Sequence, residues 1–410
     1  MIKRIAKKIK NNDIKTLIEN FFSLGALQSI NLLLPLVVLP YIVRVMGFER
    51  YGLIVLAASL VAYFSSLTDY SFKITATRDV AVFKNSQMKL SLIYSKVLTV
   101  KFIFLLLSWL AIGLIVLTYP PFREEAVVFF LTSLTLFGYM LFPEWFFQGV
   151  EKMKYIAFLN VGIKIFFTVN IFIFVRTPDD YWKYPLLNSM GYVFAGLVGQ
   201  YLLIKKYKLK FSFLKLKTIK RTVLENYPIF VNQFVPNLYN NTSTFLLGII
   251  TNTNFVGIYD AIKKVIDVGI MVIAVISRVV FPYLNRNKRD FVTYKRGMLW
   301  IGGILTILPI IFSKFVFWYL DIQYEYAFEV LSILSVGIFF VSLYDIFGLN
   351  FFIVNRKDRL VMLNTVLASL VGVLLAYPLI SFMGIIGAAI NLSLARGIMG
   401  LGMLYKYKKH

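Results

Sequence analysis

Long apolar stretches alternate with short polar connections along the whole chain. Stretches of about 20 residues, the length that a helix needs to cross a hydrocarbon core, are expected at 21–43, 52–70, 97–118, 126–147, 155–175, 185–204, 227–250, 256–281, 297–318, 328–353, 360–380 and 384–404. The pattern predicts an all-α, polytopic membrane protein with about twelve transmembrane helices.

Positive charge divides unevenly between alternate connections. Of the 44 Lys and Arg residues, 33 fall in segments assigned to one side, whereas only Arg44, Arg50, Arg123, Arg176 and Lys183 fall in connections on the other. An excess of cations is typical of cytoplasmic loops. The pattern predicts an even number of spans with both termini in the cytoplasm.

Composition excludes several functional classes. The chain is 59% hydrophobic with a mean hydropathy of +0.74, which excludes a soluble globular protein. The net charge of +24 is dispersed over short loops, where anionic lipid headgroups account for it without nucleic acid. The chain has no Cys and one His, His410, and it lacks a phosphate-binding Gly-Lys-Ser/Thr loop. We therefore expect neither a catalytic nor a metal site, no cofactor and no enzymatic activity.

The chain also divides near its midpoint. Residues 205–225 are rich in Lys and separate an expected N-terminal six-helix lobe, 1–204, from a C-terminal six-helix lobe, 226–410. Such a basic segment either lies amphipathically at the inner interface or is a solvated linker. Gly52 and Gly257 open similar spans in the two halves, which indicates a distant repeat; transporters of repeated bundles bind substrate between the repeats. The cationic start, residues 3–10, is similar to a signal peptide, but the following apolar run is long enough to remain as the first span.

The eighth span carries the densest group of charges. Asp260, Lys264, Asp267 and Arg278 fall on one face of a helix, and Lys263 lies beside them. Asp260 with Lys264, and Lys263 with Asp267, have the i,i+4 spacing at which helical side chains meet. Charges inside a span usually face a protein interior or a wet cavity. Either this face offers cations to a phosphate-bearing substrate, with Asp260 and Asp267 orienting them, or its ends reach the headgroup regions.

Four further charged residues lie within spans. Lys164 in the fifth span either faces the interior or reaches the inner interface along its aliphatic chain. Lys314 and Arg396 are weaker candidates. Asp345 in the tenth span is either an ion-coupling carboxylate, for H+ or Na+, or a structural hydrogen-bonded residue.

Three passages together resemble the Wzx-type polysaccharide (O-antigen) flippases of the multidrug/oligosaccharidyl-lipid/polysaccharide exporter superfamily. The passages are Arg44-Val45-Met46-Gly47 with Tyr51-Gly52 and residues 68–79; Phe142-Pro143-Glu144-Trp145-Phe146-Phe147-Gln148-Gly149-Val150-Glu151-Lys152-Met153; and Tyr227-Pro228 through Gly257-Ile258-Tyr259 to Lys263-Lys264. The second is the most specific. Ser71 departs from the Gly that is frequent in the family, which puts little in doubt.

This resemblance implies a V-shaped pair of six-helix bundles around a central cavity. It implies transport of oligosaccharide linked through pyrophosphate to undecaprenol, from the cytoplasmic to the periplasmic leaflet of a bacterial inner (plasma) membrane by alternating access, coupled to an ion. It also suggests that basic residues of the cavity contact the pyrophosphate or acidic sugars, and by position points to Arg44, Arg78 and Lys264. Membrane lipids, the lipid-linked glycan, a polysaccharide polymerase and chain-length machinery are the partners that it suggests.

Two other classes of protein stay open. A small-molecule or drug antiporter of the same superfamily would export soluble cations, which the basic stripe of the eighth span would repel. A multi-span O-antigen polymerase or glycosyltransferase belongs to the same pathway, but such enzymes usually need a large outer loop. Asp179 and Asp180 form the one carboxylate pair that a metal-using transferase could exploit, and they lie in a short turn.

Overall fold

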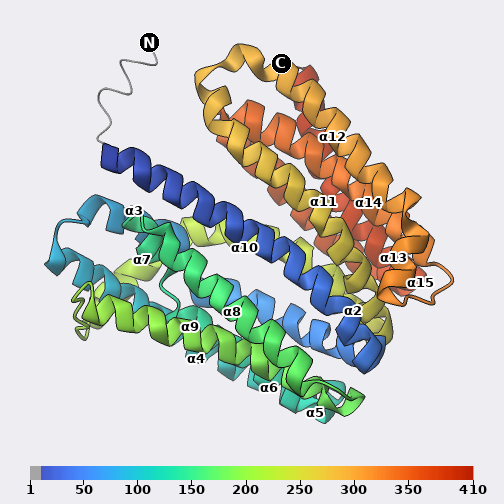
Figure 1. The fold of residues 1–410 in the computed structure, drawn as a ribbon, viewed down its shortest axis with the longest axis horizontal. Helices are drawn as coiled ribbons and strands as arrows, with labels where there is room; N and C mark the ends of the chain where they lie inside the picture. The colour runs from blue at the N-terminus through green and yellow to red at the C-terminus, as the bar shows by residue number, and fades with distance from the viewer. Residues whose placement is uncertain (1–10, 410) are drawn as a thin grey trace. The chain divides into compact units, whose positions relative to one another are not determined.

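The computed structural model describes residues 11–409, with side chains from residue 34 onward apart from 35, 232, 235, 236 and 239. The cationic start at residues 3–10 lies outside the described residues. All regular elements of the described part are helices (Figure 1), as the apolar pattern predicted. Nine of these helical segments are long and apolar enough to cross a membrane, and the chain is a multi-pass membrane protein. The expected count of twelve spans stays a prediction.

The helices follow the apolar stretches closely. The first half contains α2 (Asn11–Asp69), α3 (Phe72–Phe83), α4 (Gln87–Thr118), α5 (Pro120–Glu124), α6 (Ala126–Leu141), α7 (Glu144–Gly149), α8 (Met153–Phe174), a 3-10 turn η1 (Pro178–Trp182) and α9 (Lys183–Lys205). The second half contains α10 (Leu216–Ile250), α11 (Thr253–Arg286), a 3-10 turn η2 (Lys288–Asp290), α12 (Phe291–Ile311), α13 (Ser313–Leu320), α14 (Ala327–Leu343), a π-helix η3 (Tyr344–Ile353) and α15 (Asp358–Lys408).

Two of these elements each contain a pair of expected spans. Helix α2 is interrupted at Gly47, where φ is 75°, and α15 is interrupted at Gly384, where φ is 54°. Only glycine adopts this left-handed region readily. The two kinks therefore mark where the expected pairs 21–43 with 52–70, and 360–380 with 384–404, turn without an intervening loop.

The chain packs into two compact units. Unit 1 contains Phe64–Arg176 and Asp180–Gln233 together with the residues described before Pro35, whereas unit 2 contains Pro35–Tyr63, Thr177–Asp179 and Phe234–His410. The kinked part of α2 therefore groups with the C-terminal helices. The expected division into two six-helix lobes at residues 205–225 rests on the sequence repeat, and it stays a prediction.

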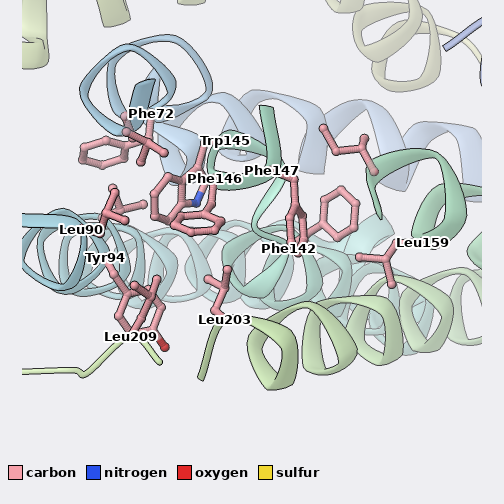
Figure 2. Packing of buried hydrophobic residues seen from close by; sticks show 14 of the residues in the cluster. Phe72, Leu90, Tyr94, Phe142, Trp145, Phe146, Phe147, Leu159, Leu203 and Leu209 are labelled. Atoms are coloured by element: carbon pink, nitrogen blue, oxygen red, sulfur yellow. The ribbon is translucent and has the colours of Figure 1, made fainter. Parts of the chain in front are cut away.

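The most specific motif of the sequence forms part of the core of unit 1. Residues 144–149 make the short helix α7, in which Trp145, Phe146 and Phe147 are buried (Figure 2). Helix α7 packs against α3. The Thr77 hydroxyl on α3 donates to the Trp145 carbonyl at 3.0 Å. The motif is therefore a packing element that ties α3 to the membrane helices.

The basic segment after α9 does not form a separate helix. Residues 208–215 have no regular structure, and the remainder of the segment belongs to α10. Gln87 at the start of α4 donates to the carbonyls of Tyr207 and Lys208, and Ser95 accepts from the Ser212 amide at 3.0 Å. Burial raises the pKa of Tyr207 to about 12. The segment is fastened along α4, so it is not a freely moving linker.

A close helix crossing lies inside unit 2. A Cβ on Gly52 of α2 would lie 1.7 Å from the Thr253 carbonyl oxygen, and one on Gly257 of α11 would lie 2.2 Å from the Phe48 carbonyl oxygen. Only glycine allows the two backbones to approach this closely. The crossing brings the neighbouring Tyr51 onto the charged face of α11.

Candidate transport site

The first charged group on α11 is a set of three residues from two helices. Lys264 Nζ lies 2.6 Å from Asp260 Oδ2, and the Tyr51 hydroxyl donates to the same oxygen while it contacts the ammonium. Lys264 Nζ also lies 5.0 Å from the centre of the Tyr51 ring. Tyr51 is buried, and only 14% of the Asp260 side chain is exposed against 32% of Lys264. The carboxylate is thus enclosed, whereas the ammonium keeps an accessible side.

Helix geometry explains the Asp260–Lys264 pair but not the expected Lys263–Asp267 pair. Asp260 and Lys264 are four residues apart and meet as expected. Among the described residues, Asp267 pairs with Arg396 of α15 at 3.4 Å and forms no ion pair with Lys263, so the expected Lys263–Asp267 contact is wrong. A guanidinium from a packed neighbouring helix competes better, because its position is fixed by burial and its fork suits a carboxylate.

Arg396 is held unusually deep for a cation. Its side chain is 7% exposed, and its Nη1 has no hydrogen-bond partner among the side and main chains that the structure describes. Lys263 acts electrostatically on Asp260. Charges of both signs therefore extend along α11 from Asp260 to Asp267, over about two turns.

Asp345 lies in the π-helix η3, next to α11 and α12. Its side chain is buried, and Ser277 and Arg278 of α11 lie near it. Asn350, in the same π-helix, donates to Ser277 Oγ at 2.7 Å and to the Tyr294 hydroxyl at 2.9 Å. Single π-helical turns inside spans occur frequently at functional sites. The arrangement gathers four side chains from three helices around one buried carboxylate.

The other expected site residues are divided between the two units. Arg44, in unit 2, is exposed and donates to the Tyr319 carbonyl at 3.2 Å. Arg78 of α3 is exposed in unit 1 and pairs with Asp79 at 3.2 Å. Lys164 is half-buried on α8, also in unit 1. Arg78 and Lys164 thus belong to unit 1, whereas Arg44 and the α11 group belong to unit 2. The roles of these three residues toward a substrate stay predictions.

The sequence did not predict the ion pair between Lys101 and Asp69. Lys101 was counted among the cations of the inner surface, but it is 2% exposed on α4 and lies 2.7 Å from Asp69 at the end of α2. The signal was present in the apolar residues that flank Lys101. Tyr51 could not be found in this way, because its partners are more than 200 positions away.

The turn that contains Asp179 and Asp180 does not support the site of a metal-using transferase. Asp180 accepts from the Arg176 amide at 2.9 Å and pairs with Lys183 at 2.5 Å, so it is engaged in closing the turn before α9. Within the described part of the chain, no group of three His, Asp or Glu side chains could hold a metal ion.

Comparison with known sequences decides the family. The polysaccharide biosynthesis protein family matches residues 17–288, about two thirds of the chain. The chain belongs to the polysaccharide biosynthesis protein family. Its match includes α11 and the triad of Tyr51, Asp260 and Lys264.

Two curated relatives of this polysaccharide biosynthesis protein are similar along nearly their whole length. A protein of Escherichia coli (strain K12) named "Putative O-antigen transporter" is 25% identical over 392 residues, which cover 93% of this chain and 94% of the relative. One of Shigella dysenteriae with the same name is 25% identical and is covered completely. The membrane-spanning pattern and the relatives agree on a membrane transporter family.

Solved structures show the same fold at low identity. The inward closed conformation of the lipid II flippase MurJ matches with a TM-score of 0.72 and 15% identity, covering 96% of this chain and 87% of that one. An inward-facing multidrug resistance MATE family transporter of the MOP superfamily matches with a TM-score of 0.63 and 13% identity, covering 92% and 94%. The polysaccharide biosynthesis protein therefore has the fold of these transporters.

Proposed function

We propose that this protein is a flippase that moves undecaprenyl-pyrophosphate-linked oligosaccharide repeat units from the cytoplasmic to the periplasmic leaflet of a bacterial inner membrane. The observation that carries the proposal is the similarity to two proteins named as O-antigen transporters over more than nine tenths of the chain. The flippase fold supports it independently. The substrate would have an anionic pyrophosphate and a polar glycan that cannot cross lipid unaided.

The α11 charges suit the anionic part of such a substrate. Lys264 is held by Asp260 and Tyr51 but keeps a third of its side chain exposed, so it can contact a phosphate without leaving the carboxylate uncompensated. Asp260 and Tyr51 would then act as positioning residues. Arg396, set by Asp267, would contribute a second fixed positive charge.

The cation distribution supports the proposed orientation. Both termini and the segment 205–225 are strongly basic, and cytoplasmic loops are enriched in such residues. The substrate is assembled by attachment to a lipid on the same side, so this orientation places the basic segments where the lipid-linked pyrophosphate would first be met.

We further propose that transport is coupled to H+ or Na+ through Asp345. A buried carboxylate surrounded by Ser277, Asn350 and Tyr294 offers oxygen ligands or a protonatable site inside a span. Arg278 would sense the charge of Asp345 and change its own interactions when an ion binds. Ion binding and substrate binding would in this way bias the same helix, α11.

Deletion of the gene in the bacterium that carries it separates the three candidate functions. A flippase predicts loss of surface polysaccharide, with lipid-linked repeat units accumulating on the cytoplasmic leaflet. A polymerase predicts single repeat units at the surface without long chains. An antiporter predicts normal polysaccharide and increased sensitivity to toxic cations, and either of the last two results would overturn the proposal.

A further inference from the structure

A pocket of about 570 Å³ lies at one end of unit 2, separate from the α11 charges. Its walls come from the end of α11, the turn η2, the start of α12 and the end of the π-helix. Three of its lining residues are cations, Lys288, Arg289 and Lys357. None of the described residues that line it is acidic.

The chain builds this pocket from two tight turns. Arg356 adopts a left-handed conformation with φ of 61°, and the Lys357 amide donates to the Phe352 carbonyl at 2.8 Å, which ends the π-helix sharply. Asn355 in this turn accepts from Lys288 Nζ at 2.9 Å. The two turns are thus tied together, and their cations face one space.

Charge around the pocket is strongly one-sided. Segments 284–296 and 354–360 contain eight Lys and Arg residues and only two carboxylates, Asp290 and Asp358. Asp290 already accepts a hydrogen bond from the Tyr283 hydroxyl. The pocket would therefore attract an anion, and its position in loops of the basic side places it at the level of lipid headgroups.

Apart from Asn350 and Asn355, the remaining lining residues are apolar and indicate an amphipathic ligand. Leu284, Phe291 and Val354 are buried, and Val292 is 50% exposed beside the cations. A free hydrated phosphate gains nothing from such a wall, whereas the glycerol and first methylenes of a lipid would cover it. Half of the pocket thus suits a phosphate and the other half an acyl chain.

We propose that this pocket binds the phosphodiester headgroup of an anionic phospholipid, such as phosphatidylglycerol, from the leaflet that faces the basic loops. Lys288, Arg289 and Lys357 would contact the phosphate, and Val292 with Phe291 would contact the glycerol and acyl region. The bound lipid would bridge the two turns that Lys288 and Asn355 already join. The site is distinct from the one proposed for the lipid-linked glycan, and it does not depend on that function.

The pocket also touches the Asp345 group. Asn350 contributes to the pocket wall and hydrogen-bonds to Ser277, Tyr294 and the Asp345 carbonyl. An occupied pocket would hold the end of the π-helix against α11 and α12. Anionic lipid would therefore stabilise one arrangement of the helix that carries Asp345.

Local fluorescence quenching tests the proposal on the full-length chain. The protein has no native Cys, so Thr293→Cys, exposed and next to the lining residue Val292, can carry a single bimane label. The protein is reconstituted into phosphatidylcholine vesicles that contain increasing fractions of brominated phosphatidylglycerol or, in parallel, brominated phosphatidylcholine. We expect half-maximal quenching at a clearly lower mole fraction of the brominated phosphatidylglycerol.

Charge variants separate the pocket from general surface attraction. The combined Lys288→Gln, Arg289→Gln and Lys357→Gln variant should lose the preference, by about fivefold for each charge removed. The matched control, Lys215→Gln, Lys217→Gln and Lys220→Gln, removes three exposed cations of unit 1 and should keep it. Lys288→Arg with Lys357→Arg keeps the charge and should also keep the preference.

Three results would overturn the proposal. Equal quenching by both brominated lipids would show that the pocket does not select an anion. An equal loss in the control variant would assign the preference to surface charge as a whole. Displacement of brominated phosphatidylglycerol by millimolar inorganic phosphate would show a small-anion site instead of a lipid site. If the triple variant does not fold, the single Arg289→Gln variant gives the same comparison.

Discussion

Gly52 on α2 and Gly257 on α11 lie against each other in a reciprocal contact. An added Cβ on Gly52 would meet Thr253 and Gly257, and one on Gly257 would meet Phe48 and Gly52. Each added Cβ would thus meet the other glycine and the residue four positions before that other glycine. Elements related by a two-fold axis make contacts of this form. The repeat indicated by the spacing of these glycines therefore has a matching contact inside unit 2.

Adding a methyl group at this crossing should separate the two helices. Gly52→Ala and Gly257→Ala each place a Cβ within 2.2 Å of a backbone oxygen, so we expect a lower thermal unfolding temperature of the purified protein and less protein in the membrane. Gly303→Ala on α12 is the control, because its Cβ would meet nothing within 4 Å. That variant should be neutral or stabilised by up to about 1 kcal/mol. Equal behaviour of the three variants would show that the crossing does not need glycine.

Removing the ammonium of Lys264 should impair transport more than insertion. In Lys264→Ala the enclosed Asp260 loses its cation, but water can still reach the site from the accessible side of Lys264, and a phosphate-attracting charge disappears. Lys264→Arg keeps the charge and should retain part of the activity. The measurement is surface polysaccharide at matched membrane levels, with Lys217→Ala as a control for an exposed charge. Normal polysaccharide in the Lys264→Ala strain would contradict a role in binding substrate.

The pair of Lys101, which is buried, and Asp69, which is half-buried, should be structural. Asp69→Asn leaves the buried ammonium unpaired, and we expect a loss of stability of about 3–5 kcal/mol, whereas Lys101→Met leaves a carboxylate that water still reaches and should cost less. The double variant should recover most of it, because a neutral pair carries no uncompensated charge. Thermal unfolding of the three purified variants measures the coupling. Additive losses in the double variant would show that the two residues do not interact.

Impermeant thiol labelling in intact cells tests the orientation. Single Cys residues at Lys210, in the basic segment, and at Asn252, between α10 and α11, should be protected and labelled respectively. Asn252 caps α11 by accepting from the Phe255 amide at 3.0 Å, so the exposed Asn254 is a second reporter that leaves this cap intact. The reverse labelling pattern would refute the orientation.

Asp345 and Arg278 should affect different steps. Asp345→Asn keeps shape and hydrogen bonding but removes the charge that an ion needs, so substrate binding should survive while gradient-driven transport falls. Arg278→Gln should weaken attraction for the anionic substrate and leave ion movement intact. Binding of the lipid-linked glycan and ion flux are measured separately for each variant. If both variants lose binding equally, or if Asp345→Asn transports normally, Asp345 is a packing residue.

The amino-acid sequence predicted the local features well. Apolar length placed the spans, and the i,i+4 spacing placed Asp260 beside Lys264. Contacts between distant segments were not predictable in this way. Tyr51 meets Asp260, and Arg396 replaces Lys263 as the partner of Asp267, only because α2 and α15 pack against α11. The count of cations on the inner side included Lys101, since charge alone does not reveal that this lysine is buried against Asp69.

The π-helix η3 could also not be predicted from the sequence. Asp345 stood out as a deep carboxylate, but nothing in residues 344–353 signals the wider turn that brings Asn350 toward Ser277 and Tyr294. That turn depends on how η3 packs against α11 and α15. The site around Asp345 therefore follows from tertiary packing, and only its charged residues, Asp345 and Arg278, stood out in the sequence.

Movement of a lipid-linked oligosaccharide between leaflets tests the central proposal most directly. The purified protein is reconstituted into vesicles with undecaprenyl-pyrophosphate-linked oligosaccharide in both leaflets, and an impermeant glycosidase removes the accessible fraction over time. The proposal predicts that the protected fraction falls with the wild-type protein, and falls much more slowly with Lys264→Ala. A protected fraction that stays constant with folded wild-type protein and its native substrate, with and without an H+ or Na+ gradient, would contradict it.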